Sequence, residues 1–251
     1  MKVIVTGSEG FIGRSLCQRL RERGCEVLRI DRVLGSDAAS LSPLLAGGGI
    51  GCVYHLAAAT NDDIGQNLSD NIATFVKVCH ACRTYKVKLV YASSPTAYSP
   101  NTTSMYGISK AFAEKFAQIY CPTSTGCRIH SAYGPHPRPG TLLWHLMNDA
   151  AVTLWNLGRN TRCFTYIDDV VDGLLFACNS SKPLVNIVNE ENTTTYQFAC
   201  EVSRFKEVRI NFLSSMRKYD AQAYKIDTSV PTIQLRYKKV RDGIEAIMKQ
   251  T

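Results

Sequence analysis

A tyrosine and a lysine stand at helical i, i+4 spacing in Tyr106-Gly-Ile-Ser-Lys110, which would place a phenol and an ammonium group on one face of a helix. A free tyrosine has a pKa of about 10 and is a poor base at neutral pH. A nearby positive charge favours the phenolate, so the pair can act as acid and base toward an alcohol. Ser94, after the preceding apolar run, adds a hydroxyl group that can hydrogen-bond the reacting oxygen. The Tyr-x-x-x-Lys spacing alone is also common in exposed helix pairs, so Ser94 strengthens the interpretation.

A glycine-rich segment near the N-terminus is suited to hold the phosphates of a dinucleotide. Thr6-Gly-Ser-Glu-Gly-Phe-Ile-Gly13 follows a β-branched run and opens a helical pattern. The first glycine permits the tight turn, the second lets backbone approach a pyrophosphate, and the third lets the helix pack closely on the sheet. Because the glycines lie between a predicted strand and a predicted helix, a turn that binds no ligand is the less favoured alternative. The residues expected to contact the cofactor are Gly7, Gly10, Phe11, Ile12 and Gly13.

The acidic residue that ends the next strand-like run bears on the choice of cofactor. A carboxylate at Asp31 can accept hydrogen bonds from an adenosine ribose. This position favours NAD over NADP, because a carboxylate repels a 2′-phosphate. Arg32 beside it keeps NADP open as the less favoured alternative.

The elements that carry these residues alternate between strands and helices. Strands are expected at 3–5, 26–30, 52–56, 88–92 and 126–130, and helices from the glycine loop to about residue 23, at 67–85 and at 105–120. Further helices are expected at 141–156, 168–178, 195–203 and 236–249. The alternation predicts an α/β fold with a doubly wound parallel (Rossmann) sheet. We expect residues 1–165, with returning segments from the last third, to form the dinucleotide-binding domain, and residues 166–251 a small C-terminal substrate-binding lobe.

The charge and the apolar pattern of the sequence limit the kinds of ligand, nucleic acid or membrane that the protein is expected to bind. The net charge of +8 suits an anionic ligand, but no block of like charges or basic–aromatic array occurs, so no nucleic-acid partner is expected. Without a long apolar run or a signal-peptide pattern, we expect a cytoplasmic protein that does not enter a membrane. Cys79 and Cys82 have CxxC spacing but no second ligand pair, so we interpret them as small apolar residues on a buried helix face and expect no metal site.

Together these motifs resemble the extended short-chain dehydrogenases/reductases, and within them the nucleotide-sugar epimerase/dehydratase group. The resemblance covers nearly the whole chain, through the glycine loop, Tyr54-His-Leu-Ala-Ala58, Asn71, Tyr91-Ala-Ser-Ser94, Tyr106 with Lys110, Tyr133-Gly-Pro135 and Arg162-Cys-Phe-Thr-Tyr-Ile-Asp-Asp169. It implies catalytic roles for Ser94, Tyr106 and Lys110. It also implies that NAD is lined by Leu56, Ala57, Ala58, Tyr106 and Lys110.

The same resemblance implies a UDP-sugar substrate whose diphosphate is held by Arg162 and Arg217, since an arginine fork suits phosphate. The alternative for each arginine is an ordinary surface charge. The resemblance further implies a homodimer formed by the helices at 67–85 and 105–120.

The residues after Ser94 bear on which reaction of the family is expected. The family's dehydratases carry Asp-Glu there and its decarboxylases keep a glutamate, whereas this chain has Pro95 and Thr96, which cannot transfer protons as carboxylates do. The resemblance therefore favours NAD-dependent 4-epimerisation of a UDP-sugar through a 4-keto intermediate, with Thr96 at the substrate. Ser131 and Arg138 can together receive a C6 carboxylate, which favours UDP-glucuronate over UDP-glucose or UDP-galactose.

One departure from the family pattern keeps other functions open. The segment between Ser94 and Tyr106 is shorter than the acidic, proline-rich loop that the family normally has. A site left open by a short loop would not retain a keto intermediate, which favours a 4-ketoreductase that releases its product. A nucleotide-sugar decarboxylase or 4-ketoreductase is therefore the alternative enzyme. A non-enzymatic NAD(P)-sensing Rossmann protein is the third possibility, against which the joint presence of Ser94, Tyr106 and Lys110 argues.

Overall fold

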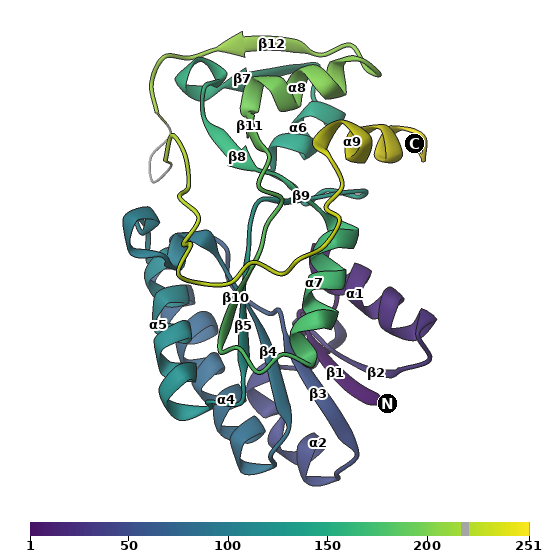
Figure 1. Ribbon diagram of the computed structural model, residues 1–251, viewed down its shortest axis with the longest axis vertical. Helices are drawn as coiled ribbons and strands as arrows, with labels where there is room; N and C mark the ends of the chain where they lie inside the picture. Colours follow the sequence, from purple (N-terminus) through teal and green to yellow (C-terminus); the bar gives the residue numbers. More distant parts are fainter. Residues whose placement is uncertain (217–220, 251) are drawn as a thin grey trace.

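A six-stranded parallel sheet forms the centre of the lower part of the protein in Figure 1, a computed structural model that describes residues 1–216 and 221–250 apart from the side chain of Ser99. In sheet order the strands are β10 (Leu184–Ile187), β5 (Thr125–Ile129), β4 (Lys88–Ser93), β3 (Ile50–His55), β1 (Lys2–Thr6) and β2 (Glu26–Ile30). Apolar and β-branched runs such as Val3-Ile-Val5, which is fully buried, form these strands because helices cover both faces of the sheet. The predicted strands are therefore present, to within a few residues at their ends.

Two layers of helices cover the sheet (Figure 1). One face packs against α1 (Phe11–Glu22) and α7 (Ile167–Cys178), and the other against α2 (Ser42–Ala46), α4 (Thr74–Thr84) and α5 (Met105–Tyr120). The short α3 (Ile64–Gln66) and a π-helical segment, Asn67–Ala73, lead directly into α4. The strand order reverses between β1 and β3, and such a switch point opens a crevice at the carboxyl ends of the strands. The predicted doubly wound Rossmann fold is confirmed.

A smaller upper part sits above the carboxyl ends of the strands (Figure 1). It contains α6 (Leu142–Asn148), α8 (Thr195–Ser203), α9 (Val240–Met248) and the strand pairs β6 (Ala132–Tyr133) with β9 (Thr165–Tyr166), β7 (Ala151–Leu154) with β12 (Arg209–Phe212), and β8 (Thr161–Cys163) with β11 (Asn192–Thr194). Its buried side chains, including Phe164 and Phe198, belong to the same hydrophobic cluster as those under α1 and α7. The upper part is thus continuous with the main core.

The chain passes between the two parts more than once. Two segments that follow residue 165, α7 and β10, return to the main sheet, where α7 packs on it and β10 joins it. Conversely, β7 and β8 precede residue 165 but pair with strands of the upper part. The upper part therefore begins earlier in the chain than the expected boundary at residue 165.

The prediction of a helix at 141–156 is wrong after residue 148. The helix α6 ends at Asn148, and β7 then pairs in parallel with β12, with Val152 opposite Ile210. The β-branched pair Val152-Thr153 favours an extended strand, and alternate residues of β7 are buried. The last helix also starts later than expected, at Val240.

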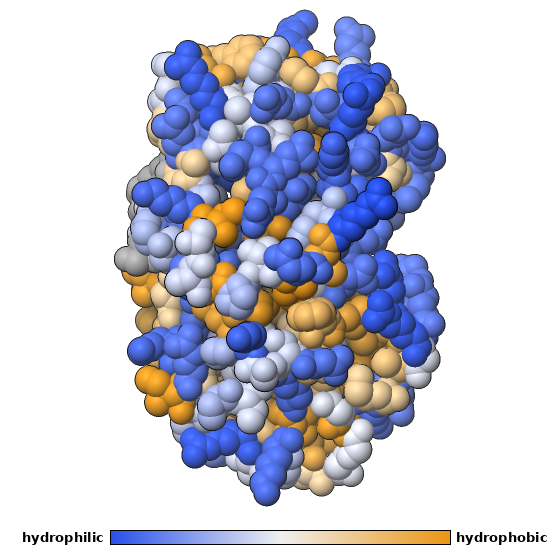
Figure 2. Space-filling model, in the orientation of Figure 1, coloured by the Kyte–Doolittle hydropathy of each residue, from blue (hydrophilic) through white to orange (hydrophobic). Residues whose placement is uncertain are grey.

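The surface carries both polar and apolar side chains, and most of the cysteines are buried. Among the described residues no helix is both long and apolar enough to cross a membrane. Figure 2 shows mainly hydrophilic side chains over the upper part on this face, whereas apolar ones gather around the middle and below it. Cys79 and Cys82 are buried and free on α4, which confirms their interpretation as small core residues.

Candidate active site

The glycine loop between β1 and α1 has the close approaches that its spacing predicts. Gly7 has φ +68°, and a Cβ atom there would lie 2.6 Å from the Ala57 backbone nitrogen. A Cβ atom on Gly13 would lie 2.0 Å from the Gly7 carbonyl oxygen, so the first turn of α1 packs directly on the loop. No side chain from the described part of the chain caps the N-terminus of α1 at Gly10. This helix end can therefore offer backbone N–H groups and positive dipole charge to an anion.

A hollow of about 250 Å³ opens beside the loop at the switch point between β1 and β3. The predicted cofactor residues that line it are Gly7, Gly10, Asp31, Arg32, Leu56, Ala57 and Ala58. Phe11, Ile12 and Gly13 follow directly as the first turn of α1. The structure thus brings seven of the expected cofactor residues together around one cavity, whereas Tyr106 and Lys110 do not line it.

Acidic residues dominate the ribose side of this hollow. The Asp31 carboxylate accepts hydrogen bonds from the backbone N–H groups of Glu9, at 3.0 Å, and Val33, at 3.1 Å. Arg32 is paired with two carboxylates. Its two terminal nitrogens donate to the Asp70 oxygens at 2.9 and 3.0 Å, and its Nε donates to Asp37 at 3.0 Å. A guanidinium group already paired in this way is poorly placed to hold a 2′-phosphate, so the hollow fits NAD.

Ser94 and Tyr106 meet at the carboxyl end of β4. The Ser94 Oγ accepts hydrogen bonds from Thr96 N, at 3.2 Å, and Thr96 Oγ1, at 2.8 Å, which leaves its own proton for the Tyr106 oxygen. Burial raises the pKa of Tyr106, while the hydrogen bond with Ser94 and the charge of Arg138 lower it. The predicted acid–base tyrosine therefore lies in a half-buried site with two groups that favour its phenolate.

Lys110 is buried under the tyrosine. Its Nζ donates to the Ala92 carbonyl oxygen at 3.0 Å and lies 5.6 Å from the centre of the Tyr106 ring. Burial lowers the pKa of Lys110 to about 8, opposed by the charge of Glu114. The neighbouring His55 is neutral, because burial and the charge of Lys110 lower its pKa to about 3. Among these groups Lys110 is the one whose charge changes near neutral pH.

The substrate residues predicted from the sequence fall in different places. Ser131 follows β5 with φ +29°, and its carbonyl accepts from Thr165 N at 3.3 Å. Arg138 lies close enough to Tyr106 to lower its pKa and donates to Thr60 Oγ1. Both therefore lie at the carboxyl end of the sheet, on the side of Ser94 and Tyr106.

Arg162 lies on β8 in the upper part, with its guanidinium 4.6 Å from the centre of the Tyr224 ring. It donates to the Thr161 and Gln222 carbonyl oxygens at 2.6 and 3.3 Å. Arg217 lies outside the described residues.

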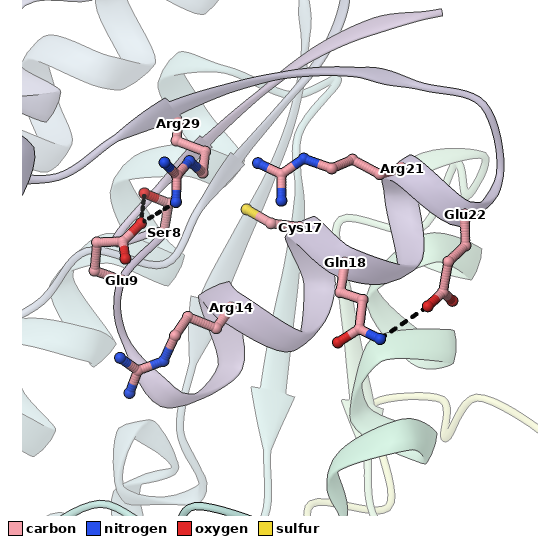
Figure 3. A pocket seen from close by; sticks show the side chains of 8 residues that line it. All are labelled: Ser8, Glu9, Arg14, Cys17, Gln18, Arg21, Glu22 and Arg29. Atoms are coloured by element: carbon pink, nitrogen blue, oxygen red, sulfur yellow. Dashed lines mark hydrogen bonds and ion pairs between the residues drawn. The ribbon is translucent and has the colours of Figure 1, made fainter.

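A second hollow of about 390 Å³ lies between α1 and β2 (Figure 3). Arg21 and Arg29 approach the Cys17 thiol there, and Arg29 pairs with Glu9 at 2.9 Å. Burial raises the pKa of Cys17 to about 11, so its thiol stays protonated at neutral pH and is a poor nucleophile. This hollow therefore receives no reactive thiolate from Cys17.

Comparison with known proteins agrees with this geometry. The sequence matches the NAD dependent epimerase/dehydratase family over residues 3–189. The chain belongs to this family. The expected NAD-dependent enzyme of the extended short-chain dehydrogenase/reductase type is thereby confirmed.

Individual family members add detail. The fold is similar to that of UDP-glucuronic acid 4-epimerase from Bacillus cereus in complex with UDP-glucuronic acid and NAD, with a TM-score of 0.81, 26% identity and coverage of 100% of this chain and 99% of that chain. The sequence is 29% identical to UDP-glucuronate 4-epimerase 3 from Arabidopsis thaliana, over 72% of this chain and 55% of that protein. It is 31% identical to UDP-2-acetamido-2,6-beta-L-arabino-hexul-4-ose reductase from Pseudomonas aeruginosa, over 68% of this chain and 48% of that protein. The chain thus spans about half the length of these two curated relatives.

The sequence prediction missed a buried ionic network next to Tyr106 and Lys110, the pair predicted to be catalytic. Arg128 on β5 donates to both oxygens of Glu114, at 2.8 and 2.7 Å, and to Asp227 at 2.7 Å. Glu114 stands at i+4 from Lys110 on α5. A charged residue within the strand at 126–130 was the available signal, because a buried arginine requires a carboxylate partner.

Proposed function

We propose that this protein is an NAD-dependent 4-epimerase of UDP-sugars, with UDP-glucuronate favoured over UDP-glucose and UDP-galactose. The observation that carries the proposal is the meeting of Ser94, Tyr106 and Lys110 at the carboxyl end of β4, beside a hollow suited to NAD. Bound NAD would supply the acceptor and donor for the hydrogen at C4, so that the sugar passes through a 4-keto form.

In this proposal the chain's own residues transfer the proton of the C4 hydroxyl group. Tyr106 takes the proton of the C4 hydroxyl group and returns it after the keto sugar has turned its other face. The proton of Ser94 is directed by two hydrogen bonds from Thr96 and can shift from the Tyr106 oxygen to the sugar oxygen. The Lys110 ammonium group, 5.6 Å from the ring centre, favours the phenolate electrostatically.

The preference for an acidic sugar depends on Arg138. This cation acts on Tyr106, and its nearest hydrogen-bond partner is the neutral Thr60 hydroxyl group rather than a carboxylate. A C6 carboxylate on the substrate could therefore pair with Arg138, with Ser131 as a second donor. The names of the Bacillus cereus and Arabidopsis relatives, both UDP-glucuronate 4-epimerases, support this choice.

A 4-ketoreductase that releases its product is the second candidate. The short loop after Ser94 and the 31% identity to a hexul-4-ose reductase favour it. The two reactions differ in redox balance, because reduction consumes a reduced cofactor in each turnover and epimerisation does not.

The upper part, which contains α6, α8 and α9 but not α7, is proposed as the substrate-binding lobe, with Arg162 and Arg217 at the diphosphate. A homodimer is proposed through α4 and α5. On α5, Ile108, Phe112 and Ile119 are 49%, 37% and 73% exposed. The aromatic rings of Phe112, Phe116 and Tyr120 stack along the same helix. A cytoplasmic location stays a prediction.

The deciding experiment is to incubate the purified protein with UDP-glucuronate, without added reductant, and to follow the sugar by NMR. Appearance of the C4 epimer without loss of CO₂ supports the proposal, and a pentose product would indicate decarboxylation instead. Tyr106→Phe is expected to lower the rate by about 10²-fold or more while leaving NAD binding intact. An active Tyr106→Phe variant would overturn the assignment of the catalytic tyrosine.

A further inference from the structure

The catalytic helix α5 carries a buried carboxylate that takes no direct part in the proposed chemistry. Glu114 is buried on the same face as Lys110, at i+4 spacing. Its Oε1 accepts from Ser93 Oγ at 2.5 Å and from Arg128 Nε at 2.8 Å, and its Oε2 accepts from Arg128 at 2.7 Å. Lys110 and Glu114 thus bond to neighbouring residues of β4, at Ala92 and Ser93, immediately before the catalytic Ser94.

The same arginine continues the network to a distant part of the chain. Arg128 donates its other terminal nitrogen to Asp227 at 2.7 Å, and the side chains of Arg128 and Asp227 are 7% and 11% exposed. Asp227 belongs to residues 221–233, called the strap here, which descend from the upper part and cross the carboxyl edge of the sheet (Figure 1). Because it passes from one part to the other, the strap's position depends on how the two parts are arranged.

Further hydrogen bonds fix the strap beside residues 95–101, which follow Ser94. The Asn101 side chain donates to the Lys225 carbonyl oxygen at 2.7 Å and accepts from the Lys225 N–H at 2.9 Å. The same amide group donates to the Pro95 carbonyl oxygen at 3.0 Å, next to Ser94. On the other side, Asn186 of β10 donates to the Asp227 carbonyl oxygen at 3.0 Å. The strap is therefore docked on the residues that surround the proposed active site.

The charges of Arg128, Glu114 and Asp227 indicate how these residues affect the protonation of Lys110. Arg128 is permanently charged, and its salt bridges to Glu114 and Asp227 bring two carboxylates to one guanidinium group. These three groups together carry one surplus negative charge. Lys110 is the adjacent buried cation that can balance this charge, and Glu114 acts on it directly. The other titratable groups facing Lys110 are Tyr106, on α5, and His55, on β3, neither of which is positive.

We propose that Glu114, Arg128 and Asp227 are positioning residues that hold Lys110 in its protonated form, and that Asp227 makes this effect depend on the docking of the strap. The inference rests on the proposed function, in which the Lys110 ammonium group favours the Tyr106 phenolate. If the strap moves away, Arg128 is left with Glu114 alone, and the surplus negative charge that stabilises the ammonium group disappears.

The test measures the titration of Lys110 directly, in the full chain with NAD present. The ¹³Cε resonance of labelled lysine is followed against pH, with Lys110→Arg used to assign it. In Glu114→Gln we expect the pKa of Lys110 to fall by roughly 1 to 3 units, the usual effect of removing a neighbouring opposite charge. In Asp227→Asn we expect a smaller fall, and Asp227→Glu should restore the original value.

Asp172→Asn is the matched control. It removes an ion-paired carboxylate, bonded to Arg19 at 2.7 Å between α1 and α7, and should leave the titration of Lys110 unchanged. Where the protein epimerises its substrate, the alkaline limb of its pH–rate profile should move to lower pH in Glu114→Gln and Asp227→Asn, in step with the NMR value. If Glu114→Gln does not fold, Asp227→Asn decides the question.

A Lys110 titration that is the same in the wild type, Glu114→Gln and Asp227→Asn overturns the inference, even if these variants are less stable. Loss of the proposed function is distinguishable from this outcome. A wild-type protein that leaves UDP-sugars unchanged refutes the epimerase, whereas the NMR titration still reports whether the network controls the charge of Lys110.

Discussion

Replacing Gly13 by alanine tests whether the glycine loop is shaped as a cofactor cradle. The added Cβ atom would lie 2.0 Å from the Gly7 carbonyl oxygen and 2.8 Å from the Ser8 Cα atom, and both of these are backbone atoms. A normal contact requires a displacement of more than about 1 Å, which a backbone held between β1 and α1 cannot make without disturbing the loop. Overpacking of this kind costs about 1–3 kcal/mol and occasionally more, and a backbone clash should lie at the upper end.

A loss of about 3 kcal/mol corresponds to a fall in Tm of roughly 6–12 °C for a chain of this size. The displaced loop should also weaken NAD binding by at least about tenfold, or about 1.4 kcal/mol. Calorimetric unfolding and NAD titration measure the two effects. Gly47→Ala is the control, because its Cβ atom would lie 3.6 Å from the nearest atom, the Leu44 carbonyl oxygen, and its φ of −67° suits alanine. A Gly13→Ala variant that melts and binds NAD like Gly47→Ala would refute the close-packed loop.

Three further predictions concern the substrate, acid stability and assembly. Arg138→Ala should lower kcat/KM for UDP-glucuronate by roughly 10- to 100-fold relative to UDP-glucose, since a hydrogen bond to a charged group contributes about 1.5–3 kcal/mol. Equal losses for both sugars would contradict a carboxylate contact. Burial lowers the pKa values of His55 and His130 to about 3 and about 4, so the unfolded chain binds more protons than the folded chain below about pH 6.5. The free energy of unfolding, measured with denaturant, should therefore fall as the pH drops from about 6.5 to about 4, by up to about 1.4 kcal/mol per pH unit for each histidine, and His130→Gln should make the slope smaller. Ile119→Glu, at a side chain that is 73% exposed on α5, should halve the mass seen by light scattering, and an unchanged mass would argue against the proposed dimer surface.

The fold could be predicted from the sequence because its signals are local. The β-branched run at 3–5, the glycine loop and Asp31 follow one another along the chain, so periodicity and turn chemistry are sufficient to predict a βαβ unit. The helix α5, which carries Tyr106 and Lys110, was likewise predicted with its observed bounds, Met105–Tyr120. The upper part was harder, because β7 is defined by its pairing with β12, nearly sixty residues later. A strand stabilised by a distant partner leaves a weak local pattern, and the segment was interpreted as helix.

The same contrast between local signals and distant contacts decides which parts of the site could be predicted. The residues brought together by consecutive elements, Ser94, Tyr106 and Lys110, could be predicted from spacing and from the rule that ligands bind at the carboxyl ends of parallel strands. The partners of Arg128 could not, because Glu114 and Asp227 come from a helix and from the strap. Only the three-dimensional structure shows that one buried guanidinium group joins these segments.

The strap also contacts the loop after Ser94, which is shorter in this chain than in the family pattern. A short loop by itself suggests a site too open to retain a keto intermediate. In the structure this loop is internally fixed, since Thr102 Oγ1 donates to the Thr96 and Tyr98 carbonyl oxygens at 2.8 and 3.2 Å. It is also held from outside, because Asn101 bonds to Lys225 of the strap through both its donor and its acceptor atoms. A loop pinned to a segment that reaches the upper part does not need great length to close a site. In the proposed epimerase, retention of the keto sugar should therefore depend on the docking of the strap, through Asn101 and Lys225, more than on the length of the loop.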